Sequence, residues 1–179
     1  DRKRLRRIAD LFEERGLDKR LRMVSSVRAN LITDDLCQIL QRLNYTHVGF
    51  GAESGSDRIL KKLKDPRYSA ADNQRALDTA KRHGFQGTCG FVLGHHDETE
   101  EDIHATYGFI LDNYASGKLA RHDITILTPM PGTPLWQWAE QHGFVRREGM
   151  EWHRLRYLAM YSNNLKGIEE WIALREQNG

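Results

Sequence analysis

Apolar residues along the chain alternate between helix-like and strand-like spacing. In the first segment Leu5, Ile8 and Phe12 recur at intervals of three and four residues, and Gly16 follows as a helix terminator. A strand-like run comes next, at residues 21–27 (LRMVSSV). The same alternation of helix and strand continues along the chain, and it is typical of α/β proteins whose parallel strands are joined by helical crossovers.

Three further strands and their helices follow from the same pattern. The strands are residues 46–52 (THVGFGA), the apolar run between Gly90 and Gly94, and residues 123–127 (DITIL). Helix starts are predicted at the capping residues Thr33, Ser56, Ser69 and Thr99, and a helix is predicted over residues 135–142. In the helix after Thr99 the apolar residues lie on one face: Ile103, Tyr107, Ile110, Leu111 and Tyr114.

About four parallel strands are too few to close a (β/α) barrel of eight. The pattern therefore predicts either a small open sheet or an arc of a barrel whose first part is missing. A length of 179 residues suits one domain. The chain begins DRKRLRR, already within a helical pattern, so we expect it to be a segment of something longer. Residues 152–160 read as a strand or amphipathic segment, and residues 168–175 as a terminal helix.

Composition narrows the classes of function. The formal net charge is +2 with acidic and basic residues interspersed, which gives no case for nucleic acid or an anionic membrane as partner. No apolar run approaches the roughly 20 residues of a membrane-spanning helix. The two cysteines, Cys37 and Cys89, are too few for a disulfide framework, and a reduced, cytoplasmic setting is predicted.

Polar residues follow each predicted strand at its C-terminal end. They are Arg28, then Glu53 and Ser54, then the loop at residues 95–98 (HHDE), and then Thr128. In a parallel sheet these ends share one edge, so the side chains are expected to line one cleft. Two structural readings stay open, since Arg28 would also serve as a cap on the sheet edge and Glu53 would also serve as a turn residue.

The stretch around Gly90 and Gly94 suits either a site or a packing turn, because glycines let a flat ligand or another backbone approach closely. The loop after it offers the metal-ligand types His95, His96 and Asp97. Adjacent histidines on one loop diverge and seldom chelate an ion without partners elsewhere, so no metal site is assigned; a metal-dependent hydrolase is one alternative. Cys89 is predicted to be a buried, inert thiol.

Three ordered motifs carry a resemblance to a known family. Residues 49–56 (GFGAESGS) resemble the GxESGS signature of radical S-adenosylmethionine (radical SAM) enzymes. Residues 90–94 with 98–102 are similar to the glycine-containing fifth strand and acidic helix of that superfamily, and residues 128–135 (TPMPGTPL) are similar to its TPxPGTPL loop. The usual Gly-Leu-Pro-Gly-Glu-Thr loop is replaced here by residues 94–99 (GHHDET).

The resemblance implies a partial (β/α)6 barrel, of which residues 1–145 would supply strands three to six and residues 146–179 a C-terminal extension. It implies that the backbone at Gly90, Val92 and Gly94, together with Leu127, holds the adenine of S-adenosylmethionine. Polar groups at Arg28, Glu53 and Ser54 would face its ribose or methionine part. The likeness is nearest to the branch with a cobalamin-binding domain, such as magnesium-protoporphyrin ester cyclases and B12-dependent methylases.

Such an enzyme would reductively cleave S-adenosylmethionine to a 5′-deoxyadenosyl radical that abstracts hydrogen from a small-molecule substrate. The full-length protein would hold a [4Fe–4S] cluster, take electrons from ferredoxin or flavodoxin, and in this branch also bind cobalamin. The Cys-x-x-x-Cys-x-x-Cys loop that ligates the cluster is absent from this chain, so the chain alone is expected to be inactive. Residues 21–27 would form an unpaired edge prone to self-association. Besides the metal-dependent hydrolase, a second alternative to a radical SAM fragment is a complete small α/β ligand-binding module without redox chemistry.

Overall fold

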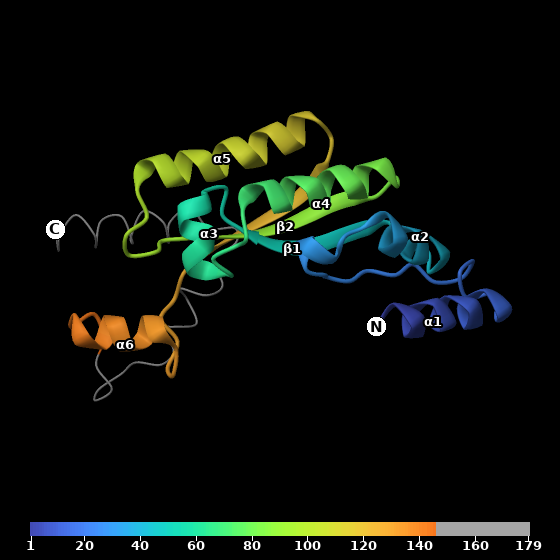
Figure 1. Ribbon diagram of the computed structural model, residues 1–179, viewed down its shortest axis with the longest axis horizontal. Coiled ribbons are helices and arrows are strands. Elements are labelled where there is room, and N and C mark those ends of the chain that lie inside the picture. Colours follow the sequence, from blue (N-terminus) through green and yellow to red (C-terminus); the bar gives the residue numbers. More distant parts are fainter. Residues whose placement is uncertain (146–179) are drawn as a thin grey trace. The chain divides into compact units, whose positions relative to one another are not determined.

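The structure is a computed structural model, and it describes residues 1–145. Along this part of the chain each strand is preceded and followed by one or more helices (Figure 1). The elements in order are α1 (Arg2–Glu14), the 3₁₀ turn η1 (Ala29–Leu31), α2 (Asp34–Arg42), β1 (His47–Glu53), α3 (Asp57–Leu63), α4 (Ala70–Arg82), β2 (Gln86–Leu93), α5 (Glu100–Ala115), β3 (Leu119–Ile126) and α6 (Pro134–Gln141).

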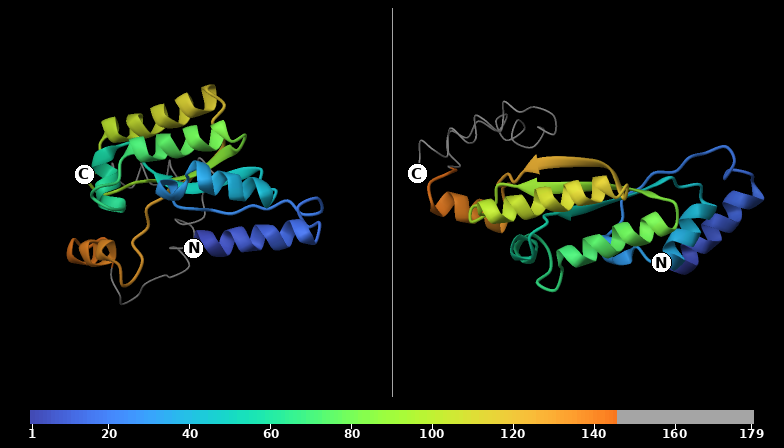
Figure 2. Two further views of the ribbon diagram at one scale, coloured as in Figure 1. Left: turned by 45° about the vertical axis from the view of Figure 1, so that its right-hand side comes forward. Right: turned by 90° about the horizontal axis from the view of Figure 1, so that it is seen from above.

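The three strands form one sheet in the order β1-β2-β3. Strands β1 and β2 are parallel, with His47 opposite Gln86 at the start of the ladder. Between β2 and β3 the Gly87 amide donates to the Lys118 carbonyl at 2.9 Å, and further along the Leu127 amide donates to Leu93 at 2.7 Å. Both partners advance in the same direction, so this pair is parallel too, as Figure 2 shows. The predicted α/β fold with a parallel sheet is confirmed.

Helices cover one face of the β1–β2 pair. Along β1 every second residue is buried, and β2 shows the same alternation with Cys89 and Phe91 on its buried side. Helices α4 and α5 lie side by side over this face (Figure 1), joined by hydrogen bonds between Gln74 and Asn113 at 3.0 Å. The opposite face of the two strands carries glycines and partly exposed side chains, and this is the face on which the candidate site lies.

The strand predicted at residues 21–27 is present only in part. It forms two isolated parallel bridges to the β1 region, Met23 with Tyr45 and Ser26 with Gly49, instead of a continuous ladder. Its side chains explain the difference, because Val24 is 75% exposed and no alternating buried face anchors the run. Its predicted role as a self-associating edge stays a prediction. Strand β3 begins at Leu119, four residues before its predicted start at Asp123.

The buried face of α5 differs from the predicted apolar stripe. Tyr107, Leu111 and Tyr114 are exposed, and among the predicted residues Ile110 is buried. The remaining buried positions are polar: Asp102, Thr106 and Asn113. These side chains have hydrogen-bond partners inside the protein, so their burial is compatible with a stable core. Apolar periodicity alone therefore identified Ile110 but not the polar residues that make up the rest of the buried face.

The chain divides into two compact units. The first comprises residues 1–91 and 96–123, and the second comprises residues 92–95 and 124–179. The second unit includes α6, whose Trp136 is buried. The predicted segments 152–160 and 168–175 and the proposed extension 146–179 lie outside the described residues. Within residues 1–145 no helix combines the length and apolar character needed to span a membrane.

Candidate functional site

Strand β1 ends in a strained turn at Glu53. The ladder to β2 slips between Gly51 and Glu53, and Glu53 has a positive φ of 65°. The Ser54 amide donates to the Ala52 carbonyl at 2.9 Å, which closes a γ-turn around Glu53. A γ-turn with positive φ at its centre is the rarer, strained form, and for a residue other than glycine it is unusual. Strain of this kind is concentrated at functional sites, which makes the end of β1 a candidate.

The turn folds the Glu53 side chain back over Gly51. A Cβ atom built on residue 51 would overlap Glu53 Oε1, so the glycine makes room for the carboxylate. Lys64, directly after α3, approaches the same place: its Nζ lies 3.8 Å from Glu53 Oε1 and donates a hydrogen bond to the Gly51 carbonyl. The Lys64 ammonium also lies over the ring of Tyr68, 4.4 Å from its centre.

Glu53 opens on a cleft of about 1170 Å³ within the first compact unit. Arg28 lines the cleft from the segment before η1, where the Val27 amide donates to the Gly49 carbonyl at 2.8 Å and holds the segment against β1. The cleft is lined by Ser26, Val27, Arg28, Ala29, Asn30, Gly51, Glu53, Leu63, Lys64, Asp65, Pro66, Arg67, Tyr68 and Asp72. The structure thus brings the two predicted residues Arg28 and Glu53 together.

The cleft is partly desolvated, and its ionisable groups respond to that. Burial raises the pKa of Glu53, and the positive charge of Lys64 opposes this rise. Burial lowers the pKa of Lys64, against the opposing effect of Glu53. Burial also raises the pKa of Tyr68 to about 12. Burial and opposite charge therefore compete at the Glu53–Lys64 pair, as is common where side chains bind charged ligands.

Strand β2 leaves an open surface at Gly90. Its position in the burial alternation places it on the face opposite α4 and α5, together with Thr88. A Cβ built on Gly90 would meet nothing within 4 Å. The absence of a side chain there is therefore not required by packing within residues 1–145, and it leaves room for a flat group to lie against the backbone.

Ser54, predicted to face the cofactor, is fully buried and has partners inside the protein. Its hydroxyl lies 3.1 Å from the Thr106 hydroxyl and accepts a hydrogen bond from the Ser56 amide at 3.0 Å. The next residue, Gly55, packs against the backbone of α5, where an added Cβ would lie 2.7 Å from Thr106 Cα. This position argues against a contact between the Ser54 side chain and a ligand. The serine and glycine of the motif instead attach α5 to the end of β1.

Asp102 completes that attachment. Its carboxylate accepts hydrogen bonds from the side chains of Ser56 and Arg58. It also accepts hydrogen bonds from the amide and the hydroxyl of Thr99, both at 2.9 Å. Burial disfavours the ionised form, but these hydrogen bonds together lower the pKa of Asp102. The helix start predicted at Thr99 is confirmed, with Asp102 completing a capping box that also fixes the loop after β1.

Three predicted adenine contacts belong to the second unit. Val92 lies near the end of β2, Gly94 has a positive φ of 92°, and the Leu127 amide donates to the Leu93 carbonyl. The last two strands are therefore in register at their C-terminal ends. The roles of Val92, Gly94 and Leu127 toward a ligand stay predictions.

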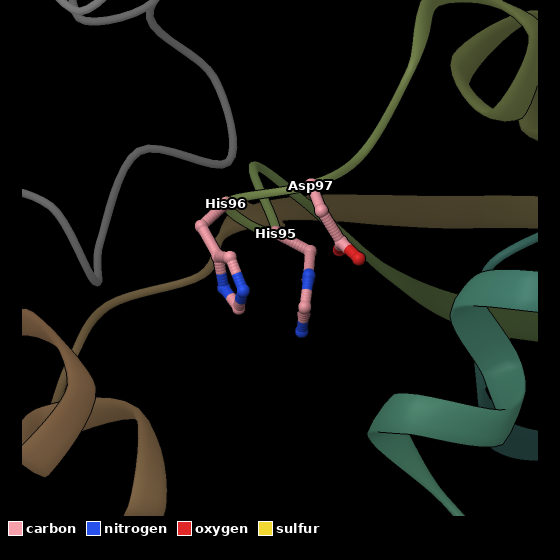
Figure 3. Close-up of side chains that lie close together, drawn as sticks. All are labelled: His95, His96 and Asp97. Atoms are coloured by element: carbon pink, nitrogen blue, oxygen red, sulfur yellow. The ribbon is translucent and has the colours of Figure 1, made fainter.

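The loop after β2 gathers three metal-ligand types. One ligand atom from each of His95, His96 and Asp97 lies within 4.8 Å of the others, and Figure 3 shows the three side chains on the same side of the loop. The Asp97 carboxylate, however, forms ion pairs with Lys62 and with Arg58, the latter at 3.3 Å. Two cations at this carboxylate disfavour a third, so the geometry gives little support to a metal-dependent hydrolase.

Neither cysteine of the chain suits an iron–sulfur cluster. Cys37 and Cys89 are fully buried on different elements, α2 and β2. Burial raises the pKa of both thiols, for Cys89 to about 12, whereas cluster ligands are thiolates. The prediction that Cys89 is a buried thiol is confirmed. The residues of this chain therefore do not fit a [4Fe–4S] cluster.

Sequence reasoning missed several residues of the cleft, among them Lys64 and Tyr68. They lie on either side of Pro66 in the connection between α3 and α4, where a lysine and a tyrosine resemble ordinary surface residues. Their nearness to β1 depends on how this connection folds back over the strand end. The site residues were predicted from their positions directly after strands, whereas Lys64 and Tyr68 follow a helix.

Comparison with known families and structures agrees with the motifs. The family model for the radical SAM superfamily matches residues 2–110. The chain belongs to the radical SAM superfamily. An uncharacterized methyltransferase of Pyrococcus horikoshii is 33% identical over 131 residues, which cover 72% of this chain and 26% of that protein. The threonylcarbamoyladenosine tRNA methylthiotransferase of Bacillus subtilis is 29% identical over 174 residues, covering 88% of this chain and 36% of its own length.

A similar fold occurs in a solved radical SAM protein. The methyltransferase TsrM from Kitasatospora setae, determined with cobalamin and a [4Fe–4S] cluster bound, matches with a TM-score of 0.66 and 19% identity. The match covers 81% of this radical SAM chain and 28% of the TsrM chain. This confirms the predicted likeness to a radical SAM barrel-like fold. The chain spans between about a quarter and about a third of the length of these relatives.

Proposed function

We propose that the cleft between Arg28 and Glu53 binds S-adenosylmethionine, and that the protein is a radical SAM enzyme of methyl or methylthio transfer. The observation that carries the proposal is the convergence of a guanidinium and a carboxylate on one partly desolvated cleft. The amino-acid end of S-adenosylmethionine bears a carboxylate and an ammonium group, and its ribose bears hydroxyls. Arg28 complements the carboxylate, and Glu53 complements the ammonium or the hydroxyls.

Gly90 supplies the complementary surface for the adenine. A base stacked against a strand needs a flat, unobstructed backbone, and the space over Gly90 is open in the first unit. Arg28, Glu53 and Gly90 thus supply a basic group, an acidic group and a flat apolar surface. They complement the carboxylate, the ammonium or ribose hydroxyls, and the adenine of S-adenosylmethionine, respectively.

The relatives support transfer of one-carbon or sulfur-containing groups. They are named as a methyltransferase and a methylthiotransferase, and the similar solved structure holds cobalamin and a [4Fe–4S] cluster. When reduced by one electron, S-adenosylmethionine supplies a 5′-deoxyadenosyl radical, which is the source of hydrogen abstraction in this chemistry. The role of this chain's residues is to bind and orient the cofactor. Cobalamin, the cluster and a ferredoxin-type or flavodoxin-type reductant would belong to the intact protein.

Binding without redox chemistry is the activity proposed for this chain taken alone. Its two cysteines are buried on different elements and burial raises the pKa of both thiols, so they are poor cluster ligands. In this proposal the intact protein carries the radical chemistry. A complete small α/β ligand-binding module without redox chemistry is the alternative.

Anaerobic iron–sulfur reconstitution of the intact protein tests the proposal. After reduction with dithionite in the presence of S-adenosylmethionine, 5′-deoxyadenosine is measured by liquid chromatography and mass spectrometry. The intact wild-type protein is expected to form it, and the isolated 179-residue chain treated in the same way is expected not to. A reconstituted intact protein that binds S-adenosylmethionine but forms no 5′-deoxyadenosine would contradict the radical assignment.

A further inference from the structure

The strained turn at the end of β1 is held from outside the strand. The Ala52 carbonyl accepts a hydrogen bond from the side-chain amide of Asn73 at 2.9 Å, and the Gly51 carbonyl accepts one from the Lys64 ammonium. Asn73 is fully buried on α4. Two successive carbonyls at the bulge are therefore bound by side chains from the segment that follows α3.

Lys64 differs from Asn73 because it also reaches the ligand-facing carboxylate. Its ammonium contacts the Gly51 carbonyl, the Glu53 carboxylate at 3.8 Å and the face of Tyr68. Its backbone is fixed at the end of α3, where its amide donates to the Leu60 carbonyl at 2.9 Å. One charge thus contacts both the backbone before the γ-turn and the side chain at its centre.

We propose that Lys64 is a positioning residue of the S-adenosylmethionine site. It holds the Glu53 turn in its strained conformation, with the Glu53 carboxylate directed over Gly51, and places a positive charge beside that carboxylate. This inference rests on the proposed function, because it assigns to Glu53 the contact with the ligand. Lys64 acts on the ligand through Glu53, so its removal is expected to leave the S-adenosylmethionine affinity of Glu53→Gln unchanged.

Other charged and titratable groups face the same cleft and set the background for this effect. They are Arg28 from the segment before η1, Asp65, Arg67 and Tyr68 from the connection after α3, and Asp72 from α4. The buried Cys89 of β2 does not line the cleft but acts electrostatically on Lys64 and Tyr68. Lys64 is the cation that forms an ion pair with Glu53. Removing it is expected to raise the pKa of Glu53, so the fall in binding as pH decreases would begin at a higher pH.

The test is a double-mutant cycle on the intact protein, with S-adenosylmethionine as the probe and isothermal titration calorimetry from pH 5 to 8. The variants are Lys64→Met, which keeps an unbranched side chain but removes the ammonium, Glu53→Gln, the double variant, and Lys64→Arg. Lys64→Met is expected to bind about tenfold more weakly, the effect of one hydrogen bond to a charged group, with its pH profile shifted upward. Lys64→Arg is expected to restore both properties, because it returns a cation with several donors.

The outcomes separate this inference from the proposed function. In the double variant the affinity is expected to equal that of Glu53→Gln alone, since coupled residues are not additive. Fully additive losses would show that Lys64 contacts the ligand directly and would overturn the positioning role, as would Lys64→Met with unchanged affinity and pH profile. A wild-type protein with no saturable binding would overturn the proposed function and this inference together. Carboxyl titration of Glu53 by NMR in the ligand-free protein checks the upward pKa shift in Lys64→Met independently.

Discussion

The carboxylate of Glu53 lies where a side chain on Gly51 would stand. An ideal Cβ on residue 51 would overlap Glu53 Oε1, although the two residues are on one strand and on the same face of it. This placement results from the γ-turn at Glu53, which bends the chain back toward its own strand. The position of the Glu53 carboxylate therefore requires a glycine at residue 51, and the turn at Glu53 places the carboxylate there.

Substituting Gly51 by alanine should displace the Glu53 carboxylate without unfolding the protein. The atom in conflict is the end of a flexible side chain, so it moves at little cost to stability. We expect the melting temperature of Gly51→Ala to change by no more than a few degrees, while affinity for S-adenosylmethionine falls about tenfold through the lost charged contact. Scanning calorimetry measures the melting temperature, and titration calorimetry measures the affinity. Gly55→Ala is the contrasting variant, because its Cβ would clash with the backbone of α5 and should strongly lower the melting temperature.

Gly90→Ala separates ligand binding from folding most cleanly. Its Cβ meets nothing within 4 Å, so stability should be unchanged or slightly increased. Affinity for S-adenosylmethionine should fall about tenfold, since an inserted methyl at a packed surface costs about 1–3 kcal/mol. Gly108→Ala on α5 is the matched control, with equally open space. Gly108→Ala should raise stability and leave the affinity for S-adenosylmethionine unchanged. If Gly90→Ala binds as tightly as Gly108→Ala, the assignment of Gly90 to the site is contradicted.

Much of the fold was predictable from sequence because its signals are local. The caps at Thr33, Ser56 and Thr99 each use a side chain within three residues of the helix start, and each is confirmed. The buried face of α5 was not predictable in this way. It depends on partners 46 and 52 residues away, Ser56 for Asp102 and Ser54 for Thr106.

The candidate site was predictable to a similar degree. Arg28 and Glu53 were found because they follow strands, and parallel strands place their ends at one edge. A turn at Glu53 was one of the readings left open, but its strained form and the approach of Lys64 were not predicted. Both accompany the bulge in β1 and the position of the α3–α4 connection beside it. Ser54 was assigned to the ligand although its hydroxyl has a buried partner on α5. A sequence motif does not distinguish residues that bind from residues that hold the binding loop.

Asp102 should control stability in acid. Its pKa is lowered in the folded protein from an ordinary value of 3.8, so its ionised form stabilises the fold above about pH 4. That stabilisation is lost as the pH falls below this value toward the lowered pKa. Asp102→Asn should therefore be less stable at pH 7 by about 1–3 kcal/mol and show a flatter loss of stability in acid. Urea denaturation between pH 2 and 7 measures this, with the exposed Glu100→Gln as a control expected to resemble the wild type.

The two thiols should be unreactive until the protein unfolds. Cys37 and Cys89 are fully buried, and burial raises the pKa of both. Iodoacetamide at pH 8 should label neither in the native protein and both in urea, as measured by mass spectrometry of the peptides. Rapid native labelling of either residue would contradict the burial that excludes them as cluster ligands.

The most direct test of the S-adenosylmethionine site is the affinity of the intact protein before and after Glu53→Gln. This change keeps the shape of the side chain and removes its charge. Titration calorimetry at pH 7.5 should show saturable binding to the wild type and to Glu14→Gln, a control on the exposed surface of α1. Binding to Glu53→Gln should be weaker by roughly tenfold to a hundredfold, as expected for a lost hydrogen bond to a charged group. Equal affinity in all three proteins would contradict the assignment of this cleft.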